Sequence, residues 1–227
     1  MTDDFSPRLD ILPKPQRRLW KELAAVPPEF VLYRGTAVAL HLGHRQSEDF
    51  DFFGNQPFDP AMLTAAIPFM TAATVTQRGP NTLSGIVDRD GPVKLSFGVP
   101  GLPRLAPPHI ASDNSLQVAS LLDLAGTKAS VVQQRAEAKD YIDVAAILRD
   151  GRIDLPTALA SAKAIYGAQF NPQITLKALL FFDDGNLRRL PRATKDLLAK
   201  AAREVDLRLP TIARAAQPAN GNRGASR

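Results

Sequence analysis

The sequence of 227 residues contains no cysteine and no long apolar run. Without cysteine there is no disulfide scaffold, no thiolate metal centre and no cysteine nucleophile. The longest charge-free stretch, residues 60–77, is broken by Pro68 and diluted by four threonines, so it does not predict a membrane span. The start Met1–Asp4 is acidic and no apolar signal region follows it. We therefore expect a cytoplasmic protein with no membrane partner. The sequence also lacks a Walker-type phosphate loop and a nucleophile elbow.

Positive charge exceeds negative charge, but the excess is confined to one end of the chain. The 28 Lys and Arg residues outnumber 23 Asp and Glu, giving a formal charge of +5. Residues 188–227 hold 10 basic and 3 acidic residues, a net of +7, whereas residues 1–187 hold 18 basic and 20 acidic residues, a net of −2. A basic segment is compatible with RNA, because phosphate contacts supply most non-specific affinity, and equally with an acidic protein partner. The charge therefore says little about chemistry in the main body.

Residues 1–112 predict a mixed sheet with helices on it. Thr36, after Gly35, is expected to cap a helix over residues 37–44. Residues 49–53 alternate acid and aromatic, the period-2 signature of a strand with one polar and one apolar face. Other strands are expected at 30–33, 73–78, 82–88 and 93–99, other helices at 15–26 and 60–68, and a proline-rich loop at 100–108.

From Ser115 onward the pattern is helical. Helices are expected at 116–135, 137–148, 155–166, 172–182 and 191–205. The fold class is therefore α+β, with a sheet domain at 1–112 and a helical bundle at 113–213 that completes the site. Residues 214–227, with almost nothing apolar, are expected to form a disordered basic tail.

The strongest chemical signal is Arg34-Gly35-Thr36 followed, after twelve residues, by the paired carboxylates of Asp49-Phe50-Asp51. On a strand, Asp49 and Asp51 project from the same side while Phe50 enters the core. Their mutual repulsion is relieved by a hard divalent cation such as Mg²⁺. Gly35, before a helix N-terminus, is suited to hold phosphate. The alternative is an exposed edge strand with a turn at Gly35.

A second group of charged residues lies in the helical half. Lys128 and Arg135 are seven apart and are expected to share a helix face, presenting two cations to one polyphosphate. Asp140 and Asp143, three apart, are likewise adjacent. The alternative is a solvated face with intrahelical ion pairs. His41 and His44 lack a third partner and are interpreted as helix-surface residues rather than metal ligands.

Two separated segments resemble a known family. The first reads LYRGTAVAL at 32–40 and GHRQSEDFDFF at 43–53, and the second reads DLAGTK at 123–128, then Arg135, then KDYID at 139–143. Together they resemble the AbiEii/AbiGii toxin family of the DNA polymerase beta superfamily of nucleotidyltransferases. The resemblance covers residues 30–182 and implies a nucleotidyltransferase-like mixed sheet with flanking helices, followed by a helical bundle.

The resemblance also implies roles for individual residues. Asp49 and Asp51 would bind Mg²⁺, and Lys128 would contact a phosphate of the nucleoside triphosphate. Asp140 or Asp143 would complete the catalytic set from the helical half. The implied nucleotide-binding residues are Gly35, Thr36, Arg45, Ser47, Lys128, Arg135 and Lys139.

One departure from the superfamily pattern stands out. A third carboxylate usually comes from the next core strand, in an apolar–acid–apolar triplet, and the matching triplet here is Leu95-Ser96-Phe97. Serine does not accept a proton as a carboxylate base does. Asp140 or Asp143 replaces it, or the chemistry is slow, or the site is a nucleotide-binding relic.

These observations leave two functional hypotheses. The first is a Mg²⁺-dependent nucleotidyltransferase that moves a nucleoside monophosphate from a triphosphate to a hydroxyl of RNA, such as a tRNA end, or of a protein. By resemblance it would be the toxin of a toxin–antitoxin or abortive-infection pair, with an antitoxin partner. The second, motivated by Ser96, is a catalytically weakened nucleotide- or RNA-binding module that acts through a partner.

Overall fold

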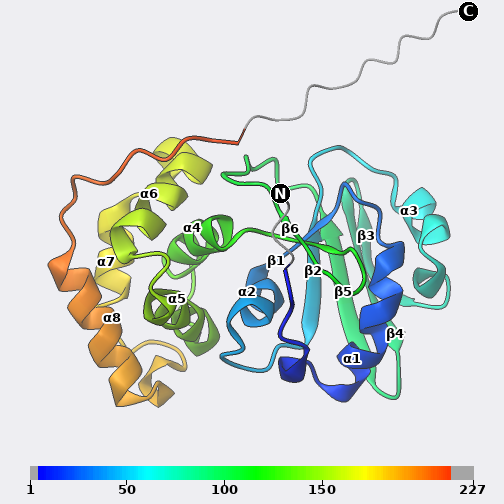
Figure 1. Cartoon of the computed structure of the whole chain (residues 1–227), viewed down its shortest axis with the longest axis horizontal. Helices are drawn as coiled ribbons and strands as arrows, with labels where there is room; N and C mark the ends of the chain where they lie inside the picture. The colour runs from blue at the N-terminus through cyan, green and yellow to red at the C-terminus, as the bar shows by residue number, and fades with distance from the viewer. Residues whose placement is uncertain (1–4, 216–227) are drawn as a thin grey trace, which may run out of the picture.

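A computed structural model describes residues 5–215 and contains a seven-stranded mixed sheet beside a helical half (Figure 1). The strand order is β3-β4-β5-β2-β1-β7-β6. The strands are β1 (Val31–Tyr33), β2 (Asp49–Phe53), β3 (Thr74–Gly79), β4 (Thr82–Asp88), β5 (Pro92–Gly98), β6 (His109–Ile110) and β7 (Gln117–Val118). The expected α+β fold class is confirmed.

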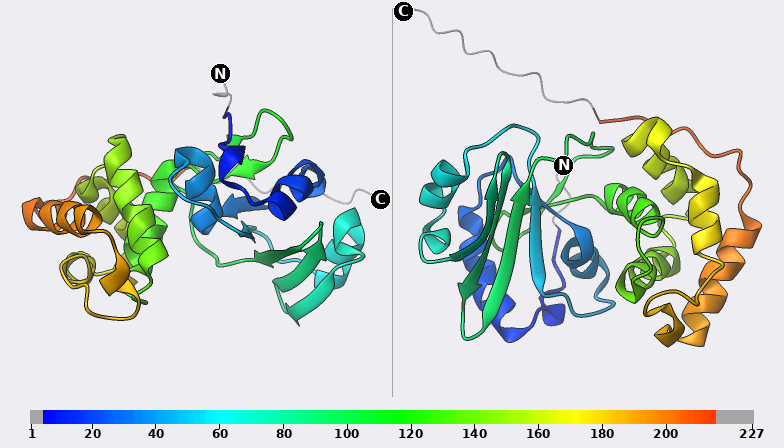
Figure 2. Two further views of the ribbon diagram at one scale, coloured as in Figure 1. Left: turned by 90° about the horizontal axis from the view of Figure 1, so that it is seen from below. Right: turned by 180° about the vertical axis from the view of Figure 1, so that it is seen from behind.

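Eight α-helices lie in the described part of the chain, and five of them form the helical half. They are α1 (Lys14–Trp20), α2 (Arg34–Leu42), α3 (Pro60–Ala66), α4 (Leu121–Val131), α5 (Ala138–Asp150), α6 (Leu155–Tyr166), α7 (Pro172–Ala178) and α8 (Arg192–Glu204). Figure 2 shows α1 and α2 on one face of the sheet, with α2 next to the helical half. There α2 packs against both α4 and α5, so it joins the two halves. No helix within residues 5–215 is long and apolar enough to cross a membrane.

Strand β2 lies at the centre of the sheet and has the expected alternation. It pairs antiparallel with β1 and parallel with β5. Phe50 and Phe52 are fully buried, with Trp20 of α1 packed against the Phe50 ring at 6.4 Å between centroids. Burying such aromatic rings contributes on the order of 2–3 kcal/mol each. The alternate residues, Asp49 and Asp51, therefore face away from this core.

Two helix starts differ from the sequence prediction. Helix α2 begins at Arg34, with extended Tyr33 as its N-cap residue, so Thr36 lies inside the helix and is not its cap. Helix α4 begins at Leu121 rather than near 116, because the Ser120 side chain accepts a hydrogen bond from the Asp123 amide. It ends at Val131, so Arg135 lies beyond it and does not share a helix face with Lys128.

The sheet continues past the expected boundary at residue 112. Strand β7 pairs with β6 and, in parallel, with β1, where Val118 lies opposite Leu32. The change from strands to helices therefore falls at Ser120. The division into two domains stays a prediction. Most of the predicted tail, residues 216–227, lies outside the described residues.

Candidate active site

A cleft of about 890 Å³ lies between the open face of the sheet and helices α4 and α5. We call its two sides the sheet wall (β2, β5 and the start of α2) and the helical wall (α4, α5 and the loop between them). The cleft is lined by the predicted residues Gly35, Thr36, Arg45, Ser47, Asp49, Asp51, Lys128, Arg135, Lys139 and Asp140, and also by Arg34, Lys94, Ser96 and Tyr166. The two sequence blocks thus meet at one place.

The paired carboxylates of β2 are accessible from the cleft. Asp49 is exposed, and the Asp51 side chain is 17% exposed. Ser96, opposite Asp51 on β5, donates a hydrogen bond of 2.5 Å from Oγ to Asp51 Oδ1. Arg34 Nη1 is 3.8 Å from the same oxygen. The position where the superfamily usually has a third carboxylate is thus a hydroxyl bonded to the second one.

Gly35 makes room for an arginine. A Cβ built on Gly35 would lie 2.3 Å from Nη2 of Arg45, which is closer than atoms can approach. Arg45 is held against Asp143 by two hydrogen bonds, Nε to Oδ1 at 2.6 Å and Nη2 to Oδ2 at 3.0 Å. Its guanidinium occupies space that a side chain at position 35 would enter, so an added methyl would displace the end of Arg45. Phosphate contact by Gly35 stays a prediction.

Thr36 and Ser47 connect α2 to β2. The Thr36 hydroxyl donates to the carbonyl oxygen of Asp49 and lies 2.8 Å from the Ser47 hydroxyl. Both residues are buried. They hold the start of β2, at Asp49, against α2. Their contact with the triphosphate stays a prediction.

The carboxylates of the helical wall have a different environment. Asp140 and Asp143 are fully buried on α5, and both accept from Lys128 Nζ, at 2.7 and 2.6 Å. Asp140 also accepts from Arg135 Nε at 2.7 Å, and Asp143 from Arg45. Lys128 itself is only 5% exposed. Buried charges of this kind persist because each is paired.

The pKa shifts of these groups follow from their partners. Burial raises the pKa of Asp143, but the His44 hydrogen bond, the Lys128 charge and Arg45 outweigh it and hold that pKa below its usual range. Burial likewise opposes the shift at Asp140, yet Arg135 and Lys128 lower its pKa. Both carboxylates are ionised at neutral pH, with their oxygens directed at cations.

Sequence reasoning missed several residues of the site. His44 Nε2 lies 2.7 Å from Asp143 Oδ1 with its side chain only 11% exposed, so its interpretation as a surface residue is wrong. His41 is partly buried, with Nε2 at 2.9 Å from the Ala119 carbonyl. Arg34 and Lys94 line the cleft from the sheet wall. Of these residues, only His44 could have been found from the sequence, because it directly precedes Arg45 in the first motif.

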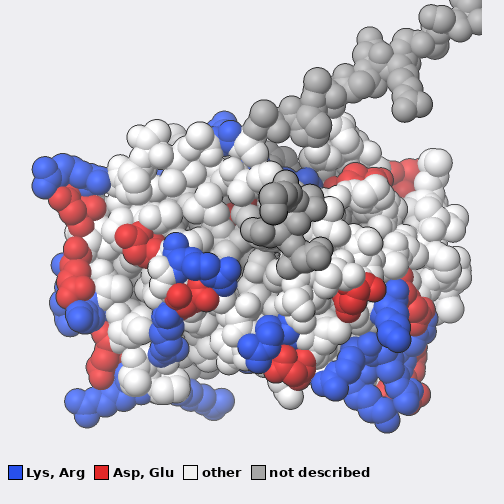
Figure 3. All heavy atoms as spheres, viewed as in Figure 1, with Lys and Arg blue, Asp and Glu red and all other residues white. Residues whose placement is uncertain are grey.

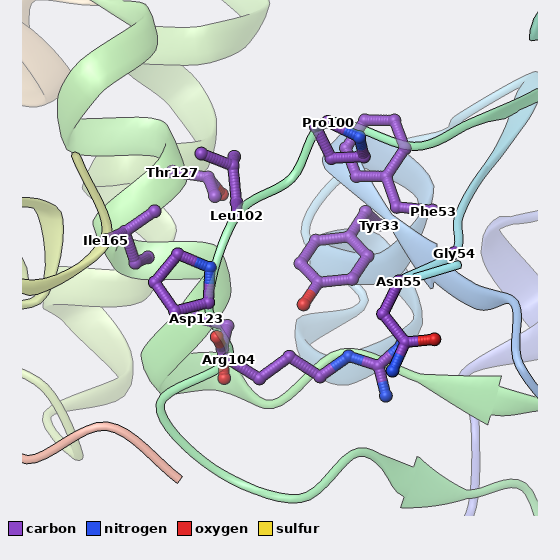
Figure 4. Close-up of a pocket in the computed structure, with 11 residues that line it drawn as sticks. Tyr33, Phe53, Gly54, Asn55, Pro100, Leu102, Arg104, Asp123, Thr127 and Ile165 are labelled. Carbon is purple, nitrogen blue, oxygen red and sulfur yellow. The ribbon is translucent and has the colours of Figure 1, made fainter. Parts of the chain in front are cut away.

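A separate recess of about 20 Å³, roughly the space of one water molecule, adjoins the cleft and shares with it Tyr33, Phe53, Pro100, Leu102 and Thr127 (Figure 4). The Tyr33 hydroxyl points toward Asp123 and Arg104 there. Burial, together with the Asp123 charge, raises the pKa of Tyr33, so the phenol stays protonated. Asp123 accepts from the Leu105 and Ala106 amides at 2.9 and 3.2 Å, which fastens the proline-rich loop to α4.

The charged surface outside the cleft is mixed. Figure 3 shows Lys and Arg gathered near α1 and along α8, with Asp and Glu among them. On α8, Arg192 pairs with Asp196 and Lys200 with Glu204, at 3.6 and 3.9 Å. Two of the three acidic residues within 188–227 are therefore paired with basic residues of the same helix, and the net excess of +7 lies on the other basic side chains.

A mixed sheet whose central strand presents two carboxylates to a cleft closed by helices is the arrangement of a nucleotidyltransferase. A family model described as "Nucleotidyl transferase AbiEii toxin, Type IV TA system" matches residues 18–217. The chain belongs to this family and is a nucleotidyltransferase. The resemblance seen in the sequence is confirmed.

Three relatives illustrate the breadth of the likeness. An uncharacterized protein of Aquifex aeolicus (strain VF5), aq_aa25, is 30% identical over 158 residues, which are 69% of this chain and 75% of that protein. The fold is similar to MenT4, a nucleotidyltransferase toxin of Mycobacterium tuberculosis H37Rv, with a TM-score of 0.57, 13% identity and 82% of each chain covered. It is also similar to a protein of H. pylori assigned as a nucleotidyltransferase, with a TM-score of 0.51, 19% identity, and 83% and 90% covered.

Proposed function

We propose that this protein is a toxin that transfers a nucleoside monophosphate from a nucleoside triphosphate to a hydroxyl group, with a divalent cation held by Asp49 and Asp51. The observation that carries the proposal is the pair of accessible carboxylates side by side on β2, facing a cleft with cations on both walls. In the reaction a bond forms between the acceptor oxygen and the α-phosphorus, the bond to the β-phosphate breaks, pyrophosphate leaves, and the proton of the acceptor hydroxyl passes to solvent water.

The donor set fits Mg²⁺. Asp49 and Asp51 offer only carboxylate oxygens, which hard divalent cations prefer, and such ions usually take one or two carboxylates together with substrate phosphates. Among residues 5–215 no group of three or more His, Asp and Glu side chains is placed to hold a metal ion. Phosphate oxygens and water would therefore complete the coordination. The bound ion would supply neutralisation of charge on the phosphates.

The remaining residues bind and orient the triphosphate. Arg34 and Lys94 on the sheet wall, with Arg135 and Lys139 on the helical wall, present cations to the cleft. Arg135 is 43% exposed and Lys139 is 53% exposed, so their charged ends can meet a ligand. Lys128 acts on phosphate from a buried position, with its ammonium group fixed by Asp140 and Asp143. These two carboxylates serve by orienting cations and do not take the place of the absent third carboxylate.

The acceptor is a hydroxyl of RNA, such as a tRNA end, or of a protein side chain, and the family assignment adds an antitoxin partner. A direct test incubates the purified protein with Mg²⁺, each labelled nucleoside triphosphate, and cellular RNA or protein. Label should enter one acceptor class and release pyrophosphate. Asp49→Asn should abolish both labelling and toxicity, whereas Asp196→Asn on α8 removes an exposed carboxylate far along the helical half and should retain both. Labelling with neither class, together with full toxicity of Asp49→Asn, would rule the proposal out.

Ser96 motivates a second candidate, a nucleotide-binding module that acts through a partner. The hydroxyl at this position is bonded to Asp51 and is not a base. Calorimetry separates the candidates, because the module would bind a triphosphate with Mg²⁺ but give no continuing heat of turnover.

A further inference from the structure

We infer that the sheet wall is built for one divalent cation and that the Arg34 guanidinium supplies positive charge on the side of Asp51 where a second ion would otherwise bind. The inference rests on the proposed function, because it concerns the cation assigned there to Asp49 and Asp51. It adds the number of ions and a role for a residue that neither sequence motif assigns.

The first argument is the state of Asp51. Its Oδ1 accepts from Ser96 at 2.5 Å and faces Arg34 Nη1 at 3.8 Å. In two-metal centres the ions lie about 3.5–4 Å apart, a separation that a carboxylate spans readily when each of its oxygens binds one ion. With Oδ1 accepting from the Ser96 hydroxyl and facing the Arg34 guanidinium, Asp51 has Oδ2 for a single ion.

The second argument is the register of the neighbouring strand. Strand β5 runs parallel to β2 and places Lys94 opposite Asp49 and Ser96 opposite Asp51. Adjacent strands are about 4.8 Å apart, so these two side chains occupy the positions from which another carboxylate could reach the same ions. One position holds a cation and the other a hydroxyl. The centre thus contains two acids flanked by the cations Arg34 and Lys94, which does not favour two dications.

The third argument is the backbone of Arg34. Its φ is +60°, a left-handed conformation that strongly favours glycine and is strained for a bulky residue. The side chain is 57% exposed, and its guanidinium lies over the Phe53 ring, 5.4 Å from the centroid. The strained residue therefore holds a planar cation between an aromatic ring and the cation-binding carboxylate.

This geometry gives Arg34 a specific task. A guanidinium has several fixed N–H donors and suits phosphate oxygens. Placed beside Asp51, it is in position to neutralise charge that develops on the phosphates during transfer. A side chain fixed in the fold then does what a second ion does in a two-metal centre.

The test counts bound ions and does not need turnover. Mn²⁺ is titrated into the full chain, held in excess over a triphosphate analogue with a non-hydrolysable α,β bridge, and free Mn²⁺ is followed by electron paramagnetic resonance. We expect one tightly bound ion per nucleotide. Ser96→Asp should raise the count to two, because it restores a carboxylate opposite Asp51. Ser84→Asp is the matched control: Ser84 lies opposite Ser96 on β4, one strand further from β2, and the count should stay at one.

The outcomes separate the inference from the proposed function. Two ions in the wild-type protein would overturn the inference and leave nucleotidyl transfer intact. No tightly bound ion would overturn the inference and also remove the cation from the proposed function. Arg34→Gln should keep one ion but lower turnover on the order of 100-fold, with partial recovery in Arg34→Lys. Unchanged turnover in Arg34→Gln would show that Arg34 does not supply the charge.

Discussion

The two walls of the cleft carry the same acidic residue in opposite environments. On the sheet wall, Asp49 is exposed and Asp51 has one oxygen free for a ligand. On the helical wall, Asp140 and Asp143 are fully buried and bonded to Lys128 and to arginines. The first pair is accessible to a ligand from solution, whereas the second pair is already bonded to the protein's own cations. Burial and bonding partners, rather than residue type, decide which aspartates are open to a ligand and which orient the cationic side chains of the protein.

Asp143→Ala should give the largest effect on stability. It leaves the buried ammonium of Lys128 and the guanidinium of Arg45 with one carboxylate fewer, so the free energy of unfolding should fall by about 3–5 kcal/mol. Asp49→Ala, on the exposed sheet wall, should change it by less than about 0.5 kcal/mol. Urea denaturation of both variants measures the difference. Equal losses of unfolding free energy in the two variants would show that the aspartates of the two walls do not differ in their contribution to stability.

The pH dependence of stability should show two separate windows. Burial lowers the pKa of His41, behind the sheet wall, from 6.5 to about 4. Between these two values His41 is protonated in the unfolded chain and neutral in the folded chain. The free energy of unfolding therefore falls by up to roughly 3 kcal/mol as the pH is lowered from 6.5 to 4. Asp140 and Asp143 have pKa values held below 3.8, so their stabilisation is complete above that pH and is lost only below it.

Denaturation midpoints measured from pH 7 down to pH 2 check the upper window and the onset of the lower one. His41→Gln should flatten the upper window and leave the lower one in place. A variant that follows the wild-type curve throughout would show that His41 does not cause the upper loss.

Gly35→Ala should weaken the link between the walls. The added methyl would displace the end of Arg45, which then loses part of its two-point contact with Asp143, at a cost of about 1–3 kcal/mol. The matched control is Gly79→Ala on β3, where a Cβ meets nothing within 4 Å. Thermal unfolding should find the control within about 0.5 kcal/mol of wild type, and a similar loss in both variants would contradict the steric account.

Lys200→Gln should give the smallest effect. Lys200 pairs with Glu204 on α8 at 3.9 Å, but both side chains are largely exposed, and such pairs contribute less than about 0.5 kcal/mol. The same substitution at Lys128 removes the cation between two buried carboxylates. Urea denaturation of Lys200→Gln and Lys128→Gln compares the two losses in free energy of unfolding. Similar losses would show that burial does not make the Lys128 pairs more stabilising than the exposed pair.

Local patterns in the sequence were sufficient for part of the fold and site. The alternation over residues 49–53 predicted both the strand and the side on which Asp49 and Asp51 lie. Helix α3 was likewise predictable, since Pro60 follows a capping Asp59 whose side chain accepts from two amides. In these cases the cause of the structure lies within a few residues.

Other features depend on contacts that no local pattern encodes. The partners Arg45 and Asp143 are 98 residues apart, and His44 is 99 residues from the same carboxylate. Strands β6 and β7 have two residues each, too few to show a period. Ser120 begins α4 inside a run that reads as one longer helix, which also misplaced Arg135. These features are set by tertiary packing, because the local sequence is compatible with more than one structure at each of them.

The fastening of the proline-rich loop by Asp123 has a mechanical consequence. Through the Leu105 and Ala106 amides the loop is tied to the first turn of α4, and the Ala215 amide bonds to the Arg104 carbonyl from the C-terminal side. Moving the loop away from α4 therefore requires both amide hydrogen bonds to Asp123 to break. A motion that keeps these bonds would carry the loop and α4 together, and such collective motions take microseconds to milliseconds.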